Sequence, residues 1–300
     1  MTDPITILDG GTGRELKRIG APFRQPEWSA LALIEAPEYV TRAHENFIRA
    51  GANIITSNSY AVVPFHIGEE RFASDGLRLV DLAGKLARQA ADAAPHSVKV
   101  AGSLPPVFGS YRADLFDASR VQSILSVLVQ GLRPYVDHWQ AETLSSIAEA
   151  QAVRTAIGND GKPLWISFTL DDEAADPSMP RLRSGEAVAD AVRAVAGLDA
   201  AAILFNCSQP EVMAAAVDTA HQTLLEIGAN LQIGVYANAF PPQRKDAEAN
   251  ADLDEIRADL TAPGYLAFAR DWVARGASIV GGCCGIGPEH IQALSVALKP

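Results

Sequence analysis

Short runs of β-branched and other apolar residues alternate along the chain with longer segments whose apolar residues recur every three or four positions. Such runs predict buried strands, and such spacing predicts amphipathic helices. We expect eight strands, at Ile5–Leu8, Asn53–Ser57, Val98–Ser103, His138–Glu142, Leu164–Phe168, Ala202–Phe205, Gln232–Tyr236 and Ser278–Val280. The segments between them, such as EYVTRAHENFIRAG and PEVMAAAVDTAHQTLLEIG, predict helices, and several end at a glycine, as helix C-termini often do.

Eight strand-helix units in a chain of 300 residues are typical of the (β/α)8 TIM barrel, in which right-handed helical crossovers join parallel strands. We therefore expect an α/β fold with one barrel domain covering residues 1–300. A doubly wound open sheet is the structural alternative. Enzymes with a barrel fold keep their chemistry at the carboxyl ends of the strands, so the active site is expected at that mouth.

The net charge of the chain limits the kinds of partner that it is expected to bind. The formal net charge is −11, with 20% charged and 48% hydrophobic residues. Proteins that bind nucleic acid or an anionic membrane need clustered lysine and arginine, so we expect neither partner. The start of the chain lacks the basic and apolar regions of a signal peptide, and no apolar run reaches the roughly 18 residues that span a bilayer. We expect a cytoplasmic protein.

All three cysteines follow predicted strands at the same end of the barrel. Cys207 comes after the sixth strand in FNC, and Cys283 and Cys284 come after the eighth in GGCCG. Three thiolates are a soft ligand set that suits zinc, and three protein ligands leave a fourth position for substrate or water. The alternatives are three small residues buried beneath a loop, or a vicinal disulfide between Cys283 and Cys284. Their shared position at strand ends, beside several glycines, favours the metal site.

Seven motifs occur in the order found in one enzyme family and extend over nearly the whole chain. They are LDGGTGRELKRIG, AGANIITSNSY, AGSLPP, AETLSSIAEA, LWISFTL, FNCSQP and VGGCCGIGPEHI. With them, the chain resembles the homocysteine S-methyltransferase family. The resemblance implies that Cys207, Cys283 and Cys284 hold a catalytic zinc. It also implies transfer of a methyl group from a small onium donor to the thiol of homocysteine, which gives methionine.

The implied zinc suits the chemistry of the acceptor. A free alkyl thiol, with a pKa of about 8.5, is only about 3% ionised at pH 7, and the thiolate is the nucleophile. Zinc that binds the sulfur in its open position would remove the thiol proton, and methionine would leave as a neutral thioether. The negative charge of the thiolates would also attract a cationic donor.

Acidic residues at the same mouth fit the ammonium group of homocysteine. Asp9 follows the first strand and Glu142 ends the fourth, and by resemblance both match positions that the family uses to hold homocysteine. Asp9 could instead cap the helix that begins near Gly13. Further polar residues near strand ends are expected as secondary substrate contacts or as hydrogen-bonding groups of the rim, namely Ser57, Asn58, Ser103, Thr169 and Asn206. We expect Asn206 to orient the Cys207 loop.

Three further features bear on the mouth. His66 and His138 are the histidines expected nearest to it. Residues Pro241–Leu260 are expected to form a solvated insertion placed where it can act as a lid. Thr143 follows Glu142, whereas some family members have a tyrosine there that can ligate zinc in the empty site. The fourth ligand without substrate is therefore open between water and a loop group.

The donor is the part least determined by the sequence. The resemblance leaves S-methylmethionine and betaine, because the chain has no further domain for cobalamin or folate. The chain stops sixteen residues after Cys284, without the oligomerising tail of betaine-specific members, which favours S-methylmethionine and a monomer or small homo-oligomer. Two alternatives from other classes are a zinc-dependent barrel hydrolase and a non-catalytic barrel that binds zinc or an amino acid. The hydrolase is disfavoured because no strand end offers a pair of histidines.

Overall fold

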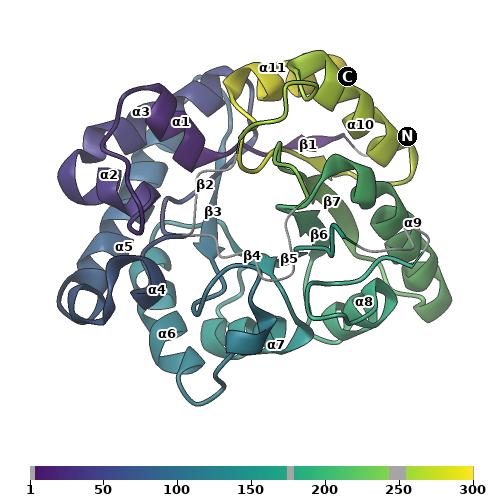
Figure 1. Ribbon diagram of the computed structural model, residues 1–300, viewed down its shortest axis with the longest axis horizontal. Coiled ribbons are helices and arrows are strands. Elements are labelled where there is room, and N and C mark those ends of the chain that lie inside the picture. Colours follow the sequence, from purple (N-terminus) through teal and green to yellow (C-terminus); the bar gives the residue numbers. More distant parts are fainter. Residues whose placement is uncertain (1–3, 174–178, 243–254, 300) are drawn as a thin grey trace.

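The predicted eight strands are present and form one parallel sheet. The computed structural model describes residues 4–173, 179–242 and 255–299. The strands are β1 (Thr6–Ile7), β2 (Ile54–Thr56), β3 (Lys99–Leu104), β4 (His138–Leu144), β5 (Leu164–Phe168), β6 (Ala202–Asn206), β7 (Gln232–Tyr236) and β8 (Ile279–Val280). Figure 1 shows them in the centre of the molecule with the helices around them. The predicted (β/α)8 barrel is confirmed.

The sheet closes between its first two strands. Neighbouring strands pair in parallel in the order β1-β8-β7-β6-β5-β4-β3-β2, which leaves β1 and β2 at the two ends. A parallel bridge between Leu8 and Ile54 joins these ends. Asn53 strengthens the junction, because its backbone N–H donates to the Ile7 carbonyl at 2.7 Å and its side chain accepts from the Ile7 N–H at 3.1 Å. The closed sheet excludes the open doubly wound alternative.

Helices surround the barrel, and each buries its apolar stripe. They are α1 (Thr12–Arg18), α2 (Ser29–Glu35), α3 (Pro37–Arg49), α4 (Pro64–Ile67), α5 (Glu69–Asp92), α6 (Val121–Leu132), α7 (Ile147–Ile157), α8 (Val188–Ala196), α9 (Pro210–Ile227), α10 (Ala262–Ala274) and α11 (Pro288–Leu298). In α3, for example, Val40, Ala43 and Phe47 are fully buried. Helices α1, α2 and α4 are additional to the pattern of one helix per strand, and they follow β1 and β2 at the mouth.

The barrel interior is a packed core. Side chains that point inward form one apolar cluster, made by Leu8, Ile54, Ala101, Trp165, Ala202, Leu204, Tyr236 and Ile279. His138 begins β4 and packs against Trp165 with the two rings tilted and their centroids 4.3 Å apart. It therefore lies at the amino end of the strands, and the expectation that it approaches the mouth is wrong. Within the described part of the chain, no helix combines the length and the apolar character needed to cross a membrane.

Candidate active site

One pocket opens at the carboxyl ends of the strands, where the site was expected. The predicted residues Asp9, Ser57, Asn58, Glu142, Cys207, Cys283 and Cys284 all line it. Ser103, Thr169 and Asn206 are fully buried and lie behind this lining. The structure thus brings seven of the ten predicted residues to one surface, and the other three support it.

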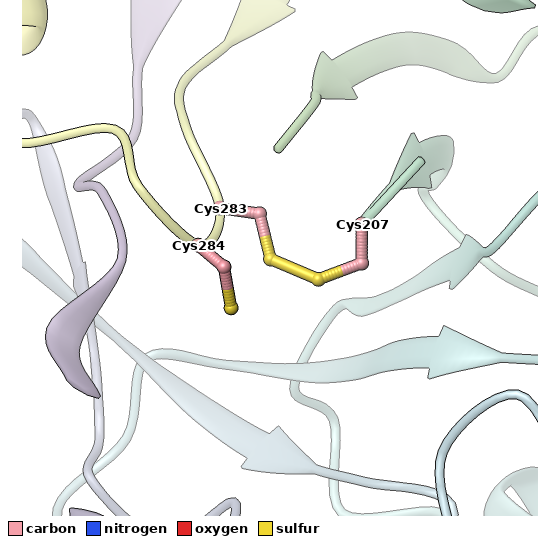
Figure 2. A group of neighbouring side chains, drawn as sticks. All are labelled: Cys207, Cys283 and Cys284. Carbon is pink, nitrogen blue, oxygen red and sulfur yellow. A yellow bond between two sulfur atoms is a disulfide. The ribbon is translucent and has the colours of Figure 1, made fainter. Parts of the chain in front are cut away.

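The three cysteines converge on one side of the pocket. Cys207 follows β6, and Cys283 and Cys284 lie in the loop after β8 (Figure 2). Their three sulfur atoms all lie within 4.8 Å of one another. Cys207 and Cys283 form a disulfide, with Cys284 beside it. The vicinal pair considered from the sequence is therefore not the pair that the structure contains.

Close backbone contacts seat the cysteine loop against the first strand. The N–H of Gly282 donates to the Asp9 carbonyl at 3.0 Å, and the N–H of Gly11 donates to the Ile286 carbonyl at 2.9 Å. A Cβ added to Gly11 would lie 2.6 Å from the Cys283 carbonyl oxygen and 3.0 Å from the Cα of Cys284. Only glycine fits at this contact. The first two glycines of the DGGTG motif, Gly10 and Gly11, therefore pack against the cysteine loop.

The sulfur cluster has the donor set and the spacing of a tetrahedral metal site. With Zn–S bonds of about 2.3 Å, tetrahedral geometry places sulfur ligands about 3.8 Å apart. The three sulfurs are already confined within 4.8 Å. Disulfide sulfurs are not thiolates, so two-electron reduction must precede metal binding by Cys207 and Cys283. Once reduced, these residues could bind a metal and leave a coordination position that faces the pocket.

Glu142 points into the pocket on the same side of β4 as Gln140, and the pairing of the strand becomes irregular next to it. The register between β4 and β5 shifts between Ala141 and Leu144, and Thr143 has a φ of 61°, in the left-handed region. The Glu142 carboxylate accepts hydrogen bonds from the Ser103 hydroxyl and, at 3.5 Å, from the Tyr236 hydroxyl. Burial, with a smaller contribution from the nearby Asp9 charge, raises the pKa of Glu142 to about 7.

Asp9 is a second buried carboxylate in the same pocket. It accepts hydrogen bonds from the N–H of Thr56 at 2.7 Å and from the Thr56 hydroxyl at 3.0 Å. Burial raises its pKa to about 7, against the lowering effect of these bonds. The N-cap of α1 is Gly11, so Asp9 does not cap this helix. Two carboxylates that interact and titrate near neutral pH are suited to bind a cationic group.

The comparison with known proteins agrees with this geometry. Residues 6–298 match the family described as homocysteine S-methyltransferase. The chain belongs to this family. It is 28% identical to homocysteine S-methyltransferase 1 of Zea mays over 323 residues, which cover 98% of this chain and 94% of the maize protein.

Solved structures of one family member have the same fold. The homocysteine methyltransferase MmuM from Escherichia coli in its metallated form matches with a TM-score of 0.78 and 27% identity. Its oxidized form matches with a TM-score of 0.78 and 26% identity. Both alignments cover 98% of this chain and 96% of the E. coli chain. The predicted family membership is confirmed.

The remaining predicted residues of this family member form a polar network around the pocket. The Ser57 hydroxyl accepts from the Ser103 N–H at 3.1 Å, and the Asn58 amide donates to the Ser29 carbonyl at 3.0 Å. The Thr169 hydroxyl bonds to the Ser208 hydroxyl at 3.0 Å, behind Cys207. The bonds of Ser57 and Thr169 tie neighbouring strand ends together, and the bond of Asn58 joins the end of β2 to the start of α2. Direct contact of Ser57 and Asn58 with substrate stays a prediction.

Several pocket residues were missed by the sequence analysis. Four aromatic side chains line the pocket, from the N-cap of α2 and from the loops after β2, β3 and β7; they are Trp28, Tyr60, Tyr111 and Phe240. Arg14 of α1 also lines the pocket, with its guanidinium 5.3 Å from the centre of the Phe240 ring. A sequence signal existed only for Tyr60, which ends the motif AGANIITSNSY. The others lie in loops and short helices, whose packing the periodicity does not predict.

Two other expectations concern the edge of the site. His66 lines the pocket, as expected, and its Nδ1 lies 3.0 Å from the Pro26 carbonyl oxygen. Residues 243–254 of the expected lid lie outside the described residues. Just after them, Arg257 pairs with Glu211 at 2.6 Å, at the start of α9.

Proposed function

We propose that this enzyme transfers a methyl group from S-methylmethionine to homocysteine, with a zinc ion held by Cys207, Cys283 and Cys284. The observation that carries the proposal is the convergence of three cysteine sulfurs within 4.8 Å, in a pocket that also contains two carboxylates. When bound, zinc would hold the acceptor sulfur as a thiolate at neutral pH. The barrel is proposed to act as one domain, residues 1–300.

The acidic pair would bind the acceptor through its ammonium group. Glu142 and Asp9 line the same pocket as the cysteines, and both have a pKa of about 7 without substrate. An ammonium group that binds between them favours their charged forms and lowers both pKa values. The acceptor is thus held at two points, through its sulfur at the cysteines and through its ammonium at the carboxylates.

The aromatic side of the pocket would bind the donor. A sulfonium cation is attracted to the faces of Trp28 and Tyr60, which are partly exposed in the pocket. S-methylmethionine is favoured over betaine because a thioether is a better leaving group than a tertiary amine. Arg14 would pair with the donor carboxylate, since it is the one arginine or lysine among the described residues that line this pocket.

The reaction balances without a further co-reactant. The homocysteine thiol releases its proton to solvent, and the thiolate attacks the methyl carbon in line with the bond to the donor sulfur. The new S–C bond forms as the old one breaks, and the electron pair of the broken bond stays with the donor sulfur. Both products are methionine.

The test is methionine formation by the reduced, zinc-loaded chain. Homocysteine is supplied with S-methylmethionine or betaine, and initial rates are compared. We expect turnover with S-methylmethionine, and Cys284→Ala should lose both zinc and nearly all activity while keeping the fold. Ser59→Ala removes a buried hydroxyl outside the pocket lining and serves as a control that keeps its zinc. Full activity in Cys284→Ala would refute the zinc site, and faster methionine formation from betaine would refute the donor.

A further inference from the structure

Asn206 forms two hydrogen bonds with a single residue of β4. It is the last residue of β6 and is fully buried. Its Oδ1 accepts from the backbone N–H of Thr143 at 2.9 Å, and its Nδ2 donates to the Thr143 hydroxyl, also at 2.9 Å. The amide therefore fixes both the backbone and the side chain of Thr143.

Thr143 needs this support because of its conformation. It is β-branched and has a φ of 61°, a region that such residues rarely occupy. Its backbone lies at the register shift between β4 and β5, directly after Glu142. Glu142 lies on the same side of β4 as Gln140, as strand alternation requires, and both side chains bond to the Tyr236 hydroxyl, so the shift affects the chain from Thr143 onward. The Asn206 amide thus holds the residue that directly follows Glu142, at the point where β4 departs from regular pairing.

Asn206 is also bonded in the chain to the first cysteine of the sulfur cluster. Cys207 has a φ of 51°, and its N–H donates to the Tyr236 carbonyl at 3.3 Å. The hydroxyl of the same tyrosine donates to Glu142 at 3.5 Å. A closed set of contacts therefore runs from Glu142 through Thr143, Asn206, Cys207 and Tyr236 and returns to Glu142.

We propose that Asn206 is a positioning residue that fixes the separation between the ammonium site at Glu142 and the sulfur site at Cys207. It thereby selects aminothiols in which the two groups are as far apart as in homocysteine. This inference rests on the proposed function, since it takes the acceptor to be held at both points. It replaces the expectation that Asn206 contacts substrate, because Asn206 lies behind the pocket lining.

The test measures how much the ammonium group of the acceptor contributes to kcat/KM. Homocysteine is compared with 4-mercaptobutanoate, the same thiol without its amino group, and the ratio of their kcat/KM values is the ammonium factor. We expect a factor of about 30 or more in the wild type. In Asn206→Ala this factor should fall at least about tenfold, while zinc content stays at one ion per chain. Dissociation constants from calorimetry give the same ratio without turnover.

Two controls separate positioning from a general loss of structure. Asn238, at the carboxyl end of β7, is equally buried and accepts from the Phe240 N–H at 3.2 Å, so Asn238→Ala removes a comparable bond that does not touch Thr143. Its ammonium factor should match the wild type. Because Asn206 acts through Glu142, adding Asn206→Ala to Glu142→Gln should change the factor no further. If Asn206→Ala does not fold, Asn206→Leu takes its place.

The outcomes distinguish this inference from the proposed function. A wild-type chain that makes no methionine refutes the proposed function, and the calorimetric ratio then still decides the role of Asn206. An ammonium factor in the Asn206 variant within threefold of the wild type overturns the inference. An equal fall in Asn238→Ala, or a further fall in the double variant, also overturns it. A selective fall that is absent on the Glu142→Gln background supports it.

Discussion

Glu142→Gln should weaken homocysteine binding while leaving the shape of the site intact. Two charges about 4 Å apart attract by about 4 kcal/mol at an effective dielectric constant of 20. Asp9 remains in the variant and retains part of this attraction. The net loss should therefore be about 2 to 4 kcal/mol, which is roughly a 30- to 900-fold rise in the KM for homocysteine. The amide oxygen of the introduced glutamine can still accept from Ser103 or Tyr236, as the Glu142 carboxylate does.

The effect of Glu142→Gln on kcat/KM should also depend on pH. The pKa of Glu142 is raised to about 7, so in the empty site its ammonium-binding form is present above pH 7 and is lost as the pH falls through 7. Protonated glutamate is neutral, as glutamine is. The difference in kcat/KM between the wild type and Glu142→Gln should therefore be largest near pH 8 and should shrink toward pH 5.5. Because Glu142 and Asp9 interact, the fall in kcat/KM toward low pH reports the titration of both carboxylates as a pair.

The assay is a series of initial rates against homocysteine concentration from pH 5.5 to 8.5, with saturating S-methylmethionine. Glu149→Gln is the matched control, because burial also raises the pKa of Glu149 to about 7, yet this residue caps α7 outside the pocket. Its variant should keep the wild-type KM. A KM for Glu142→Gln within threefold of the wild type at pH 8, or a ratio that stays constant with pH, would refute the role given to Glu142.

Three other outcomes follow from the same site. Without reductant the Cys207–Cys283 disulfide should prevent zinc uptake, and treatment with a phosphine should restore one zinc per chain, measured by metal analysis. Arg14→Met should raise the KM for S-methylmethionine about 10- to 100-fold, and much less for trimethylsulfonium, which has no carboxylate. Asp9→Asn should be more stable than the wild type at pH 8, by up to about 4 kcal/mol in the free energy of urea unfolding. Burial raises the pKa of Asp9 to about 7, so the stability that the protonated carboxyl provides at low pH is lost as the pH rises through 7.

The fold was predictable because each strand is buried on both sides. In β6, for example, Ala202, Ile203, Leu204 and Phe205 are all fully buried, so the strand is a continuous apolar run, as in other parallel sheets. The polar residue that follows such a run marks the mouth, which is why the cysteines and both carboxylates were found from the sequence. This argument depends only on the position of a residue along its strand.

The supporting residues were not predictable on the same grounds. The sequence places Glu142 at a strand end, but it does not indicate the register shift beside it, where Asn206, a residue more than sixty positions away, holds Thr143. The aromatic side chains depend on α1, α2 and the loops, where no period applies. Trp28, for example, has a φ of 51° at the N-cap of α2, which no propensity indicates. Their contribution to the pocket arises from tertiary packing alone.

The two cysteine loops are both held by β7, a strand that contains no cysteine. Strands β6 and β8 are separated by β7, and neighbouring strands lie about 4.8 Å apart, so their ends should be roughly 9 to 10 Å apart. The Cα atoms of Cys207 and Cys283 are nevertheless only 5.6 Å apart. Both loops bend over the end of β7, where Cys207 donates to the Tyr236 carbonyl and Cys283 donates to the Ala237 carbonyl at 2.9 Å. The carboxyl end of β7 therefore supports both cysteine loops, and backbone changes there should lower zinc uptake, measured by metal analysis, although no cysteine is altered.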